Sequence, residues 1–528
     1  MSETARSLPN GTTSQDVSRS RVMPVIALAV IMVSSSASSL NLALPSIASD
    51  TGANQTQLLW IVDAYSVPLS ALLLAAGALG DRYGRRLILI SGLSLFGAAA
   101  LVASVVSAPE ALIVCRALMG ISGAMVMPTT LSIITTTLPR EQRASAVGMW
   151  VGLAGGGAVV GLLASAILLE YFDWNSVFVL TVILAVAAII GAATMLSRDK
   201  ADNAQRLDLL GALLSLLGIG SIVVGLLEGS DRGWSDPLVL VLLIGGLCLL
   251  ALLVWHEFRT DQPMIDPRIF TIRGVEAGAV SVFVLSFAAY GFIYMLTQYL
   301  QFVGGLSTLK VVAAMIPFAL VMIPASRFTP ALAARFGGNR VTPAGFVVAA
   351  VGFGLCATLS VDVDYFVLTI GLVLIALGLA LVTTPSTTAI VGSLPDRKQG
   401  VASAVSQTSR EIAGAVGVAL LGAVLNSGYS NSLSDKIPAG APAGPAEQAE
   451  ASIAAANAIA KQIGPNGQAL TTAAANAFVH GFGTALVVAT AVALLGAVYA
   501  ALRSPRQHSA TNPTTPPEPG SSGKAKQR

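Results

Sequence analysis

Charged side chains occur inside several long apolar stretches of this sequence, where a bare charge is costly. They are Asp63, Arg116, Arg327, Arg410 and Glu411. An ionisable group in such a stretch is a functional candidate by default, because it must face water, a counter-charge or a substrate. Asp63 is the best proton or cation site, since a carboxylate in a partly dry cavity can bind and release a proton.

Each of these assignments has a structural alternative. Asp63 lies only a few residues into its stretch, so it is either a proton site or a solvated residue that accepts from Tyr65. Arg116 either takes part in function or ties helices together through backbone carbonyls. Arg410 and Glu411 are adjacent, so on a helix they point about 100° apart and do not pair with each other. Either one of them faces a cavity and the other a neighbouring helix, or both are structural.

Mild polar and aromatic side chains lie among Met, Phe and Leu in the same stretches. They include Asn41, Tyr65, Tyr290, Tyr294, Gln298 and Gln407. With Arg327, Arg410 and Glu411 they predict a cavity for a bulky amphipathic compound, bound by apolar contact and a few hydrogen bonds. The aromatic side chains also fit a packing stripe or an interfacial belt.

The sequence contains no motif of an enzyme, a cofactor site or a metal site. It has neither a phosphate-binding loop of the Gly-x-x-x-x-Gly-Lys-Ser/Thr type nor a His-Glu-x-x-His pair. Cys115, Cys248 and Cys356 lie inside apolar runs and are interpreted as small hydrophobes. The net charge of +3 is small and gives no indication of nucleic-acid binding.

The composition is that of a polytopic membrane protein, because 54% of the 528 residues are hydrophobic and only 11% are charged. Apolar runs long enough to span a bilayer predict fourteen helices. They cover residues 23–44, 58–79, 87–107, 111–133, 144–169, 177–196, 209–227, 238–256, 275–302, 311–334, 341–359, 366–391, 401–425 and 477–502.

Alternate connections between these runs are basic, and the others are mostly acidic. The positive-inside rule therefore predicts that both termini are cytoplasmic. Residues 1–22 and 504–528 are predicted to be disordered cytoplasmic tails. Residues 427–476, rich in Ala, Gly and Pro, are predicted to form a long outer loop with helical pieces such as 446–460.

A short charged turn, residues 77–86, lies between two of the apolar runs. Its key residues are Gly77, Gly80, Asp81, Arg82, Gly84, Arg85 and Arg86. The glycines permit a sharp reversal, and the arginines favour the cytoplasmic face. Asp81 can accept hydrogen bonds from arginines or from the amides of a neighbouring helix start. Residues 331–337 repeat the register of residues 78–84 without the acid.

This turn resembles the loop between helices two and three of the major facilitator superfamily. The fourteen runs, together with residues 41–45 and 60–66, resemble its drug:proton antiporter branch with fourteen helices, which includes quaternary-ammonium and multidrug efflux proteins. The resemblance implies an all-α membrane fold of two six-helix halves, 23–196 and 275–503, with an inserted helix pair within 197–274. It also associates Arg116 with proton coupling.

The sequence departs from that branch at particular positions. Gly157 and Gly161 keep the glycine spacing of the helix-five motif and suit close helix packing, but Leu162 replaces its proline. Ser36 and Gln407 stand where cation exporters of the branch carry acids. These losses weaken the case for multivalent cations.

The resulting prediction is a plasma (inner) membrane protein, a monomer, that exports hydrophobic or amphipathic drugs in exchange for protons. A dedicated exporter of an endogenous lipid, siderophore or antibiotic is the main alternative, and a receptor that does not transport is a third.

Overall fold

The computed structural model of the protein describes residues 14–197, 208–260, 263–434 and 443–504. Within these ranges the regular elements are all helices, and no strand occurs. Thirteen helices are long and apolar enough to cross a membrane, and the apolar part of α1, Val22–Ser38, is a fourteenth candidate of shorter length. The fourteen predicted runs therefore all correspond to helices. The segments 1–13 and 505–528, which hold most of the two predicted tails, lie outside the described residues. Residues 14–22, predicted to be disordered, instead form the start of α1.

The helices fall into three groups in chain order. The first group is α1 (Ser14–Ser38), α3 (Gln55–Tyr83), α4 (Arg85–Ala103), α5 (Pro109–Thr137), α6 (Arg140–Tyr171) and α7 (Asn175–Met195). The inserted pair is α8 (Leu209–Arg232) and α9 (Pro237–Arg259). The last group is α10 (Arg273–Gln298), α12 (Ile316–Phe336), α13 (Gly338–Cys356), α14 (Tyr365–Gly392), α15 (Gln399–Ser434) and α18 (Gln468–Arg503).

Short elements appear where the predicted runs break. The first run ends in a 3-10 turn at Ser39–Leu42, which precedes α2 (Leu44–Thr51). The tenth run divides into α11 (Thr308–Ala314) and α12, because Pro317 occupies the first turn of α12 and favours a helix start there.

The predicted outer loop is shorter than expected. Both α15 and α18 extend into the range 427–476. The start of α18 is rich in Ala, which favours helix, and the end of α15 is held by its contact with the connection that follows. The remaining connection carries two short helices, α16 (Ala443–Ala451) and α17 (Ile453–Ile463). The hydroxyl of Tyr429 on α15 donates to the carbonyl of Ala449 at 2.8 Å and holds this helical hairpin against the bundle.

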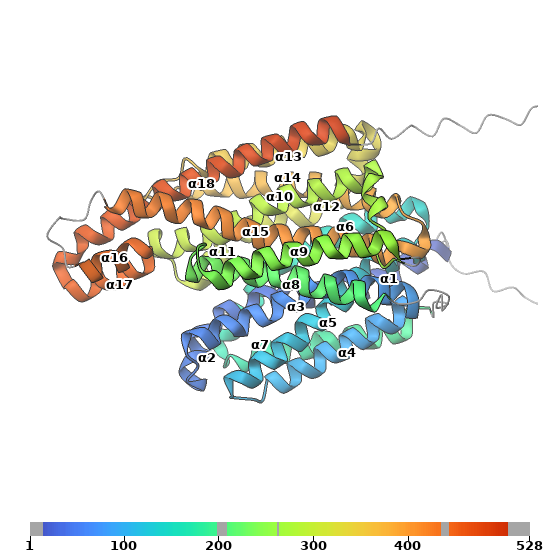
Figure 1. The fold of residues 1–528 in the computed structure, drawn as a ribbon, viewed down its shortest axis with the longest axis horizontal. Helices are drawn as coiled ribbons and strands as arrows, with labels where there is room; N and C mark the ends of the chain where they lie inside the picture. The colour runs from blue at the N-terminus through green and yellow to red at the C-terminus, as the bar shows by residue number, and fades with distance from the viewer. Residues whose placement is uncertain (1–13, 198–207, 261–262, 435–442, 505–528) are drawn as a thin grey trace, which may run out of the picture.

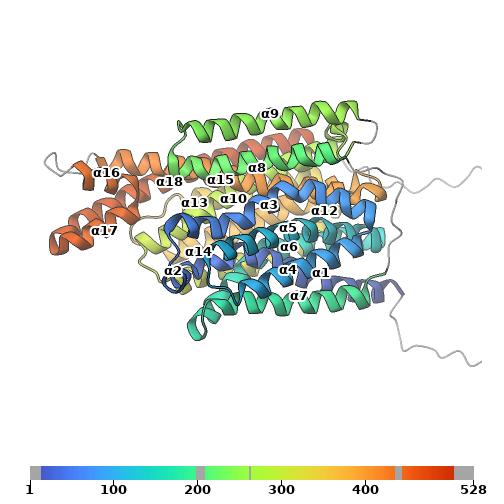
Figure 2. The same ribbon diagram turned by 60° about the horizontal axis from the view of Figure 1, so that its bottom comes forward.

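The two helix groups lie side by side, as Figure 1 shows. They contact each other along two seams, α3 with α15 and α6 with α12. The inserted helix α8 packs on α3 and α15, and α9 packs on α8 (Figure 2). Because few side chains of α9 are buried, this helix presents an apolar surface to its surroundings.

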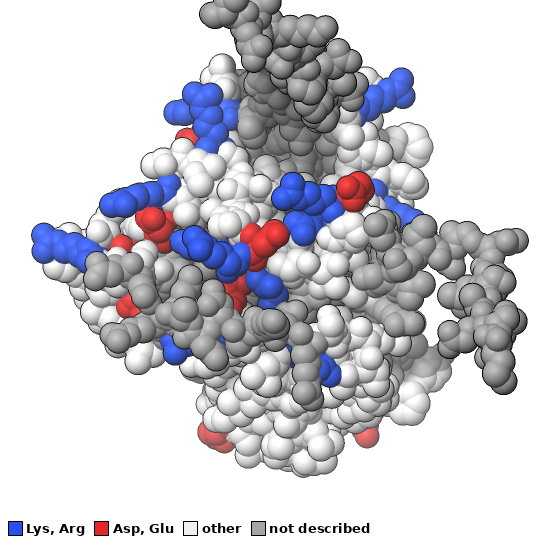
Figure 3. Space-filling view, turned by 90° about the vertical axis from the view of Figure 1, so that its right-hand side faces the viewer, with Lys and Arg blue, Asp and Glu red and all other residues white. Residues whose placement is uncertain are grey.

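The two ends of the bundle differ in charge. We name the end where α3 meets α4 the motif end, and the end that carries α16 and α17 the hairpin end. Figure 3 views the motif end and shows Lys and Arg side chains spread across it. The described basic residues there include Arg82, Arg85, Arg86, Arg140, Arg143, Arg268, Arg335, Arg340, Arg397 and Lys398. The described connections at the hairpin end are mostly acidic, with Asp50, Glu110, Glu170, Asp173, Asp362 and Asp364.

Candidate functional site

Two turns at the motif end share one backbone conformation. Gly84 links α3 to α4 with φ +96° and ψ 132°, and Gly337 links α12 to α13 with φ +86° and ψ 138°. A side chain at a positive φ of this kind is strained, so both turns need glycine. The repeat predicted between residues 78–84 and 331–337 is therefore a repeat of local structure.

Asp81, one turn before Gly84, joins the two halves of the molecule. Its side chain is only 6% exposed, and Arg85 contacts it at 2.9 Å. The amide of Gly400 donates to both carboxylate oxygens at 3.0 and 2.9 Å, and the amide of Val401 donates at 3.2 Å. These amides belong to the first turn of α15, where the helix dipole favours an anion. One carboxylate on α3 thus holds the start of α15.

Glycine makes this approach possible on both helices. A Cβ atom on Gly77 would lie 2.5 Å from the carbonyl oxygen of Gly400 and 2.7 Å from the Cβ of Ala404. A Cβ atom on Gly400 would lie 2.8 Å from the Asp81 carboxylate. Gly80 is different, because a Cβ atom there would have the hydroxyl of Thr129 as its nearest neighbour, at 3.4 Å, which is an ordinary van der Waals distance.

The arginines of the turn have separate partners. Arg85 also donates to the carbonyl of Asp396 at 3.0 Å, on the far side of the seam. Arg86 donates to the carbonyls of Ala192 and Ala193 at the end of α7. The guanidinium of Arg82 lies 5.1 Å from the ring centroid of Tyr83.

A central cavity of about 330 Å³ lies between the two halves. Its apolar wall includes Leu69, Met127, Met315, Phe318 and Met322, and its polar wall includes Ser34, Ser38, Ser66, Ser286, Tyr290, Thr383, Gln407, Arg410 and Glu411. These residues come from α1, α3, α5 and α6 of one half and α10, α12, α14 and α15 of the other. A cavity with this lining suits an amphipathic ligand.

The polar groups of α15 concentrate in this cavity. The Arg410 guanidinium lies 5.8 Å from the ring centroid of Trp150, while its Nε and Nη2 groups have no hydrogen-bond partner. The side-chain oxygen of Gln407 is also unpartnered. Glu411 is the one carboxylate among the described lining residues. Unpartnered polar groups in a buried cavity are groups that a ligand can satisfy.

Tyr290 faces Arg410 and Glu411 from α10. It is 41% exposed and packs against Gly414 of α15, where a Cβ atom would lie 3.0 Å from the tyrosine ring. The predicted cavity residues Tyr290, Gln407, Arg410 and Glu411 therefore meet on one wall.

Arg116 lies outside this lining, in a separate buried cluster. It is 1% exposed, and it donates from Nε to the carbonyl of Ile61 at 3.0 Å and from Nη1 to the carbonyl of Ser36 at 3.1 Å. Its guanidinium lies 4.3 Å from the ring centroid of Tyr65, whose hydroxyl donates to the Val33 carbonyl at 2.8 Å. The structural alternative for Arg116, a tie to backbone carbonyls, is present in this geometry.

Asp63 is half-buried and close enough to Arg116 for an electrostatic interaction. Neither residue belongs to the described lining of the central cavity. The two residues that the sequence singles out for coupling thus lie near each other, at the junction of α1, α3 and α5.

The structure places the remaining predicted residues elsewhere. Tyr294 is exposed, Gln298 is half-buried and Arg327 is exposed, and none is among the described cavity residues. The side chain of Asn41 lies outside those that the structure describes. Gly157 and Gly161 lie against Ser34 and Ser35, where α6 crosses α1.

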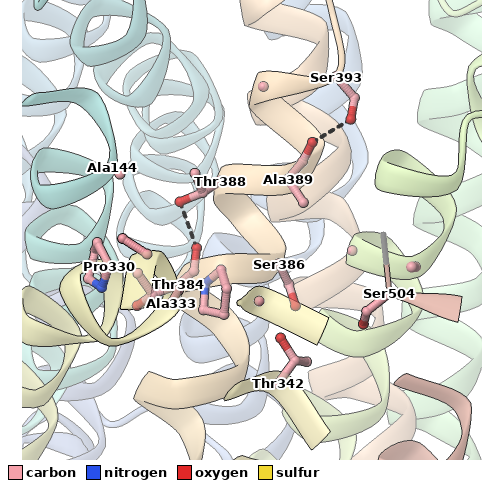
Figure 4. A pocket seen from close by; sticks show the side chains of 16 residues that line it. Ala144, Pro330, Ala333, Thr342, Thr384, Ser386, Thr388, Ala389, Ser393 and Ser504 are labelled. Carbon is pink, nitrogen blue, oxygen red and sulfur yellow. Dashed lines mark hydrogen bonds between the residues drawn. The ribbon is translucent and has the colours of Figure 1, made fainter. Parts of the chain in front are cut away.

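A second cavity, of about 410 Å³, lies at the motif end, between helices of the second half and Ala144 of α6 (Figure 4). Its described lining comes mainly from α12 and α14 and carries no charged side chain, only hydroxyls such as Thr384 and Thr388. The Thr388 hydroxyl donates to the Thr384 carbonyl at 2.8 Å, so it is occupied within its own helix. This cavity therefore offers little to a ligand that needs charge recognition.

Sequence reasoning missed part of the central cavity. Trp150 lies behind the cavity wall rather than in the described lining: its indole donates to Thr130 at 3.0 Å, and its ring lies near Arg410, which does line the cavity. Ser34 and Ser38 also line the cavity, whereas the sequence indicated only that Ser36 in the same segment replaces an acid. A buried tryptophan on a helix rich in glycine was the available signal, because a large side chain there must fill space that the glycines leave.

Comparison with known proteins agrees with this architecture. The model of the Major Facilitator Superfamily matches residues 26–418. The methyl viologen resistance protein SmvA of Salmonella typhimurium is 32% identical over 476 residues, covering 90% of this chain and 96% of its own. The multidrug efflux pump LfrA of Mycolicibacterium smegmatis is 31% identical, with 90% and 94% covered.

Two further comparisons extend the range of similar proteins. The cephamycin export protein CmcT of Amycolatopsis lactamdurans is 31% identical over 80% of this chain and 88% of its own. The structure of the human organic anion transporter MFSD10 superposes with a TM-score of 0.61 at 13% identity, covering 91% of this chain and 99% of that one. With its spanning helices, paired halves and repeated turn, this chain is a multi-pass membrane protein and belongs to the Major Facilitator Superfamily.

Proposed function

We propose that this protein is a secondary active transporter that exports hydrophobic or amphipathic drugs in exchange for protons. The observation that carries the proposal is the central cavity, which both halves line and which holds Arg410, Gln407 and Glu411 on one wall. The similarity to drug resistance and efflux proteins over nine-tenths of the chain supports the same conclusion.

The charge of the two ends supports an orientation. Because cytoplasmic connections carry an excess of Lys and Arg, the basic motif end is proposed to face the cytoplasm of a plasma membrane. The Asp81–Gly400 contact then closes the cytoplasmic side of the α3–α15 seam. Rocking of the halves must break this contact and form it again in each cycle.

We propose that Glu411 carries the exchanged proton, because it is the carboxylate that faces the cavity. A protonated Glu411 leaves the positive charge of Arg410 uncompensated, and an ionised one balances it. The binding of a substrate beside these groups therefore changes the affinity of Glu411 for its proton. The Asp63–Arg116 pair is proposed to contribute through the α1–α3–α5 junction, where Arg116 holds two backbone carbonyls.

The test is ethidium efflux from proteoliposomes with an imposed pH step, using the variants Glu411→Gln and Asp63→Asn. Loss of pH-driven efflux in Glu411→Gln, with protein still in the membrane, supports the cavity carboxylate. Loss of pH-driven efflux in Asp63→Asn alone assigns proton coupling to Asp63 and Arg116 instead. Full, uncoupler-sensitive efflux in both variants refutes both assignments.

Export of one endogenous product is the second candidate, favoured by the two unpartnered N–H groups of Arg410. These donors suit a substrate with a carbonyl or carboxylate, and one similar protein is described as exporting cephamycin. Deletion of the gene followed by dye retention and metabolite profiling separates the two candidates. General drug sensitivity supports drug export, and loss of a single secreted product supports the dedicated exporter. We propose that a monomer performs either function.

A further inference from the structure

A third cavity, of about 290 Å³, lies on the far side of the α3–α15 seam, and we name it the lateral pocket. Its described lining includes the polar side chains of Glu257, Thr408 and Ser409 and the apolar side chains of Leu74, Phe270 and Phe283. Val254 and Phe270 are each 45% exposed, so the pocket opens on the outer surface of the bundle. The opening lies beside α9, the outermost helix in Figure 2.

Glu257 is the one charged residue of this described lining. It is only 4% exposed, two residues before the end of α9 at the motif end. Its Oε2 atom accepts from the amide of Ile265 at 3.2 Å, whereas Oε1 is buried without a partner. A buried carboxylate oxygen without a donor is costly, so the site lacks a group that could donate to it.

The neighbouring histidine does not supply that donor. His256 contacts both carboxylate oxygens of Asp208 at 3.0 Å, and the Asp208 side chain also accepts from the Gly211 amide. Of the Lys and Arg side chains that the structure describes, none forms a salt bridge with Glu257. Asp208 is thus satisfied, while the adjacent Glu257 keeps an uncompensated oxygen.

A second unpartnered polar atom lines the same pocket. The Thr408 hydroxyl is buried and has no hydrogen-bond partner. One carboxylate oxygen and one hydroxyl can both be satisfied by a group with several N–H donors. The rest of the described wall, including Leu74, Phe270 and Phe283, is apolar.

We propose that the lateral pocket binds a protonated alkylamine, with its ammonium group against Glu257 and Thr408 and its chain among the apolar side chains. The volume is at the small end of ligand pockets, which suits an ammonium group and part of one chain better than a polycyclic compound. The shared chemistry is a cationic N–H head on an apolar tail, supplied either by a soluble amphiphile or by an aminophospholipid of the membrane.

The pocket is distinct from the central cavity. Thr408, Ser409 and Ile412 face the lateral pocket, whereas Gln407, Arg410 and Glu411 face the central cavity from the same helix. On α3, Leu74 lines the lateral pocket and Leu73 lines the central cavity. The α3–α15 seam separates the two sites, so occupancy of one can be measured without the other.

The test is photolabelling of the full-length protein in phosphatidylcholine nanodiscs with a diazirine-bearing dodecylamine, followed by peptide mapping. We expect labelling within residues 253–270 and 405–412, with competition by dodecylamine and none by dodecanol. In Glu257→Gln the labelling falls by about tenfold, as the loss of one charged hydrogen bond implies. Glu276→Gln is the matched control, because Glu276 lies at the same end but contacts Tyr499 and Arg503 instead.

Ser409→Trp provides a second variant that fills the pocket and leaves the Glu257 carboxylate in place, and it removes the labelling as well. Nanodiscs that contain phosphatidylethanolamine separate the two sources: protection from labelling identifies the lipid as the occupant, and its absence identifies the free amine. Labelling of folded Glu257→Gln at the level of the unmodified protein, or equal competition by dodecanol, overturns the proposal. Because labelling needs no transport, this result is independent of whether the protein exchanges drugs for protons.

Discussion

The backbone amide of Gly400 donates to both carboxylate oxygens of Asp81, across the seam between the two halves of the molecule. The contact joins the end of α3 to the start of α15, positions more than 300 residues apart in the chain. It combines a buried carboxylate, a helix N-terminus and two glycines without side chains. These features make closure of the motif end sensitive to substitution at Asp81, Gly77 and Gly400.

Asp81→Asn is expected to weaken closure of the motif end. Asparagine keeps one acceptor oxygen but replaces the other with an NH2 donor, so one of the two Gly400 contacts is lost and the ion pair with Arg85 is lost as well. A charged hydrogen bond contributes about 1.5–3 kcal/mol, so the population open at the motif end should rise about tenfold or more. Spin-label distances across the α3–α15 seam measure this population.

Asp396→Asn is the matched control for that variant. Asp396 lies at the same end, but its side chain is exposed and pairs with Arg143 at 3.3 Å. A surface pair of this kind contributes little. Equal distance distributions for the Asp81 variant and the unmodified protein would show that the carboxylate does not control closure.

Gly77→Ala is expected to separate α3 from α15 and to reduce transport. The added Cβ would lie 2.5 Å from a backbone carbonyl, which cannot move without shifting the helix. Overpacking of this kind costs about 1–3 kcal/mol. Gly80→Ala, which meets only the Thr129 hydroxyl at 3.4 Å, should keep normal efflux in the same assay. A similar loss of efflux in the two variants would show that the close contact between Gly77 and α15 is not what transport requires.

Arg116→Lys is expected to lower the midpoint of thermal unfolding in detergent. Lysine keeps the positive charge but lacks the planar guanidinium group of arginine. It therefore cannot donate to the carbonyls of Ile61 and Ser36 and stack on the Tyr65 ring at the same time. The same substitution at exposed Arg327 should leave the midpoint unchanged. If both variants have the same unfolding midpoint as the unmodified protein, the hydrogen bonds of Arg116 do not stabilise the packing of α1 and α3.

Arg410→Lys is expected to raise the KM for a substrate that accepts hydrogen bonds, by about tenfold, with a smaller effect on kcat. The guanidinium stacks near Trp150 and presents two free donors to the cavity, and an ammonium group reproduces neither feature. Initial rates of transport in proteoliposomes over a range of substrate concentrations give both constants. An unchanged KM would mean that only the charge at position 410 matters.

The sequence predicted the helices of this fold well, because about 20 consecutive apolar residues have few structures available to them in a bilayer. The turn at Gly84 and its repeat at Gly337 were also predictable, since glycine at fixed spacing implies a particular backbone conformation. The helix breaks near Ser38 and Met315 were not predicted, because the hydropathy of an apolar run does not change where the helix ends and a new one begins.

The candidate site was less predictable than the fold. Sequence placed Arg116 and Asp63 in a functional pair, but it could not show that Arg116 would be held by carbonyls of two other helices. It predicted Arg410, Glu411 and Arg327 as cavity residues, but only Arg410 and Glu411 belong to the described lining of the central cavity, because α15 faces it and Arg327 is exposed. The burial of Glu257 was not predictable from sequence, because its environment depends on contacts between α9 and the segment before α10.

The central claim is that substrate and proton exchange through one cavity that contains Glu411. It is tested most directly by recording internal pH and substrate content together in liposomes that contain the purified protein. We expect substrate movement in one direction to be accompanied by proton movement in the other, and both to be lost in Glu411→Gln. Substrate transport that proceeds at the normal rate with no change in internal pH would contradict the account.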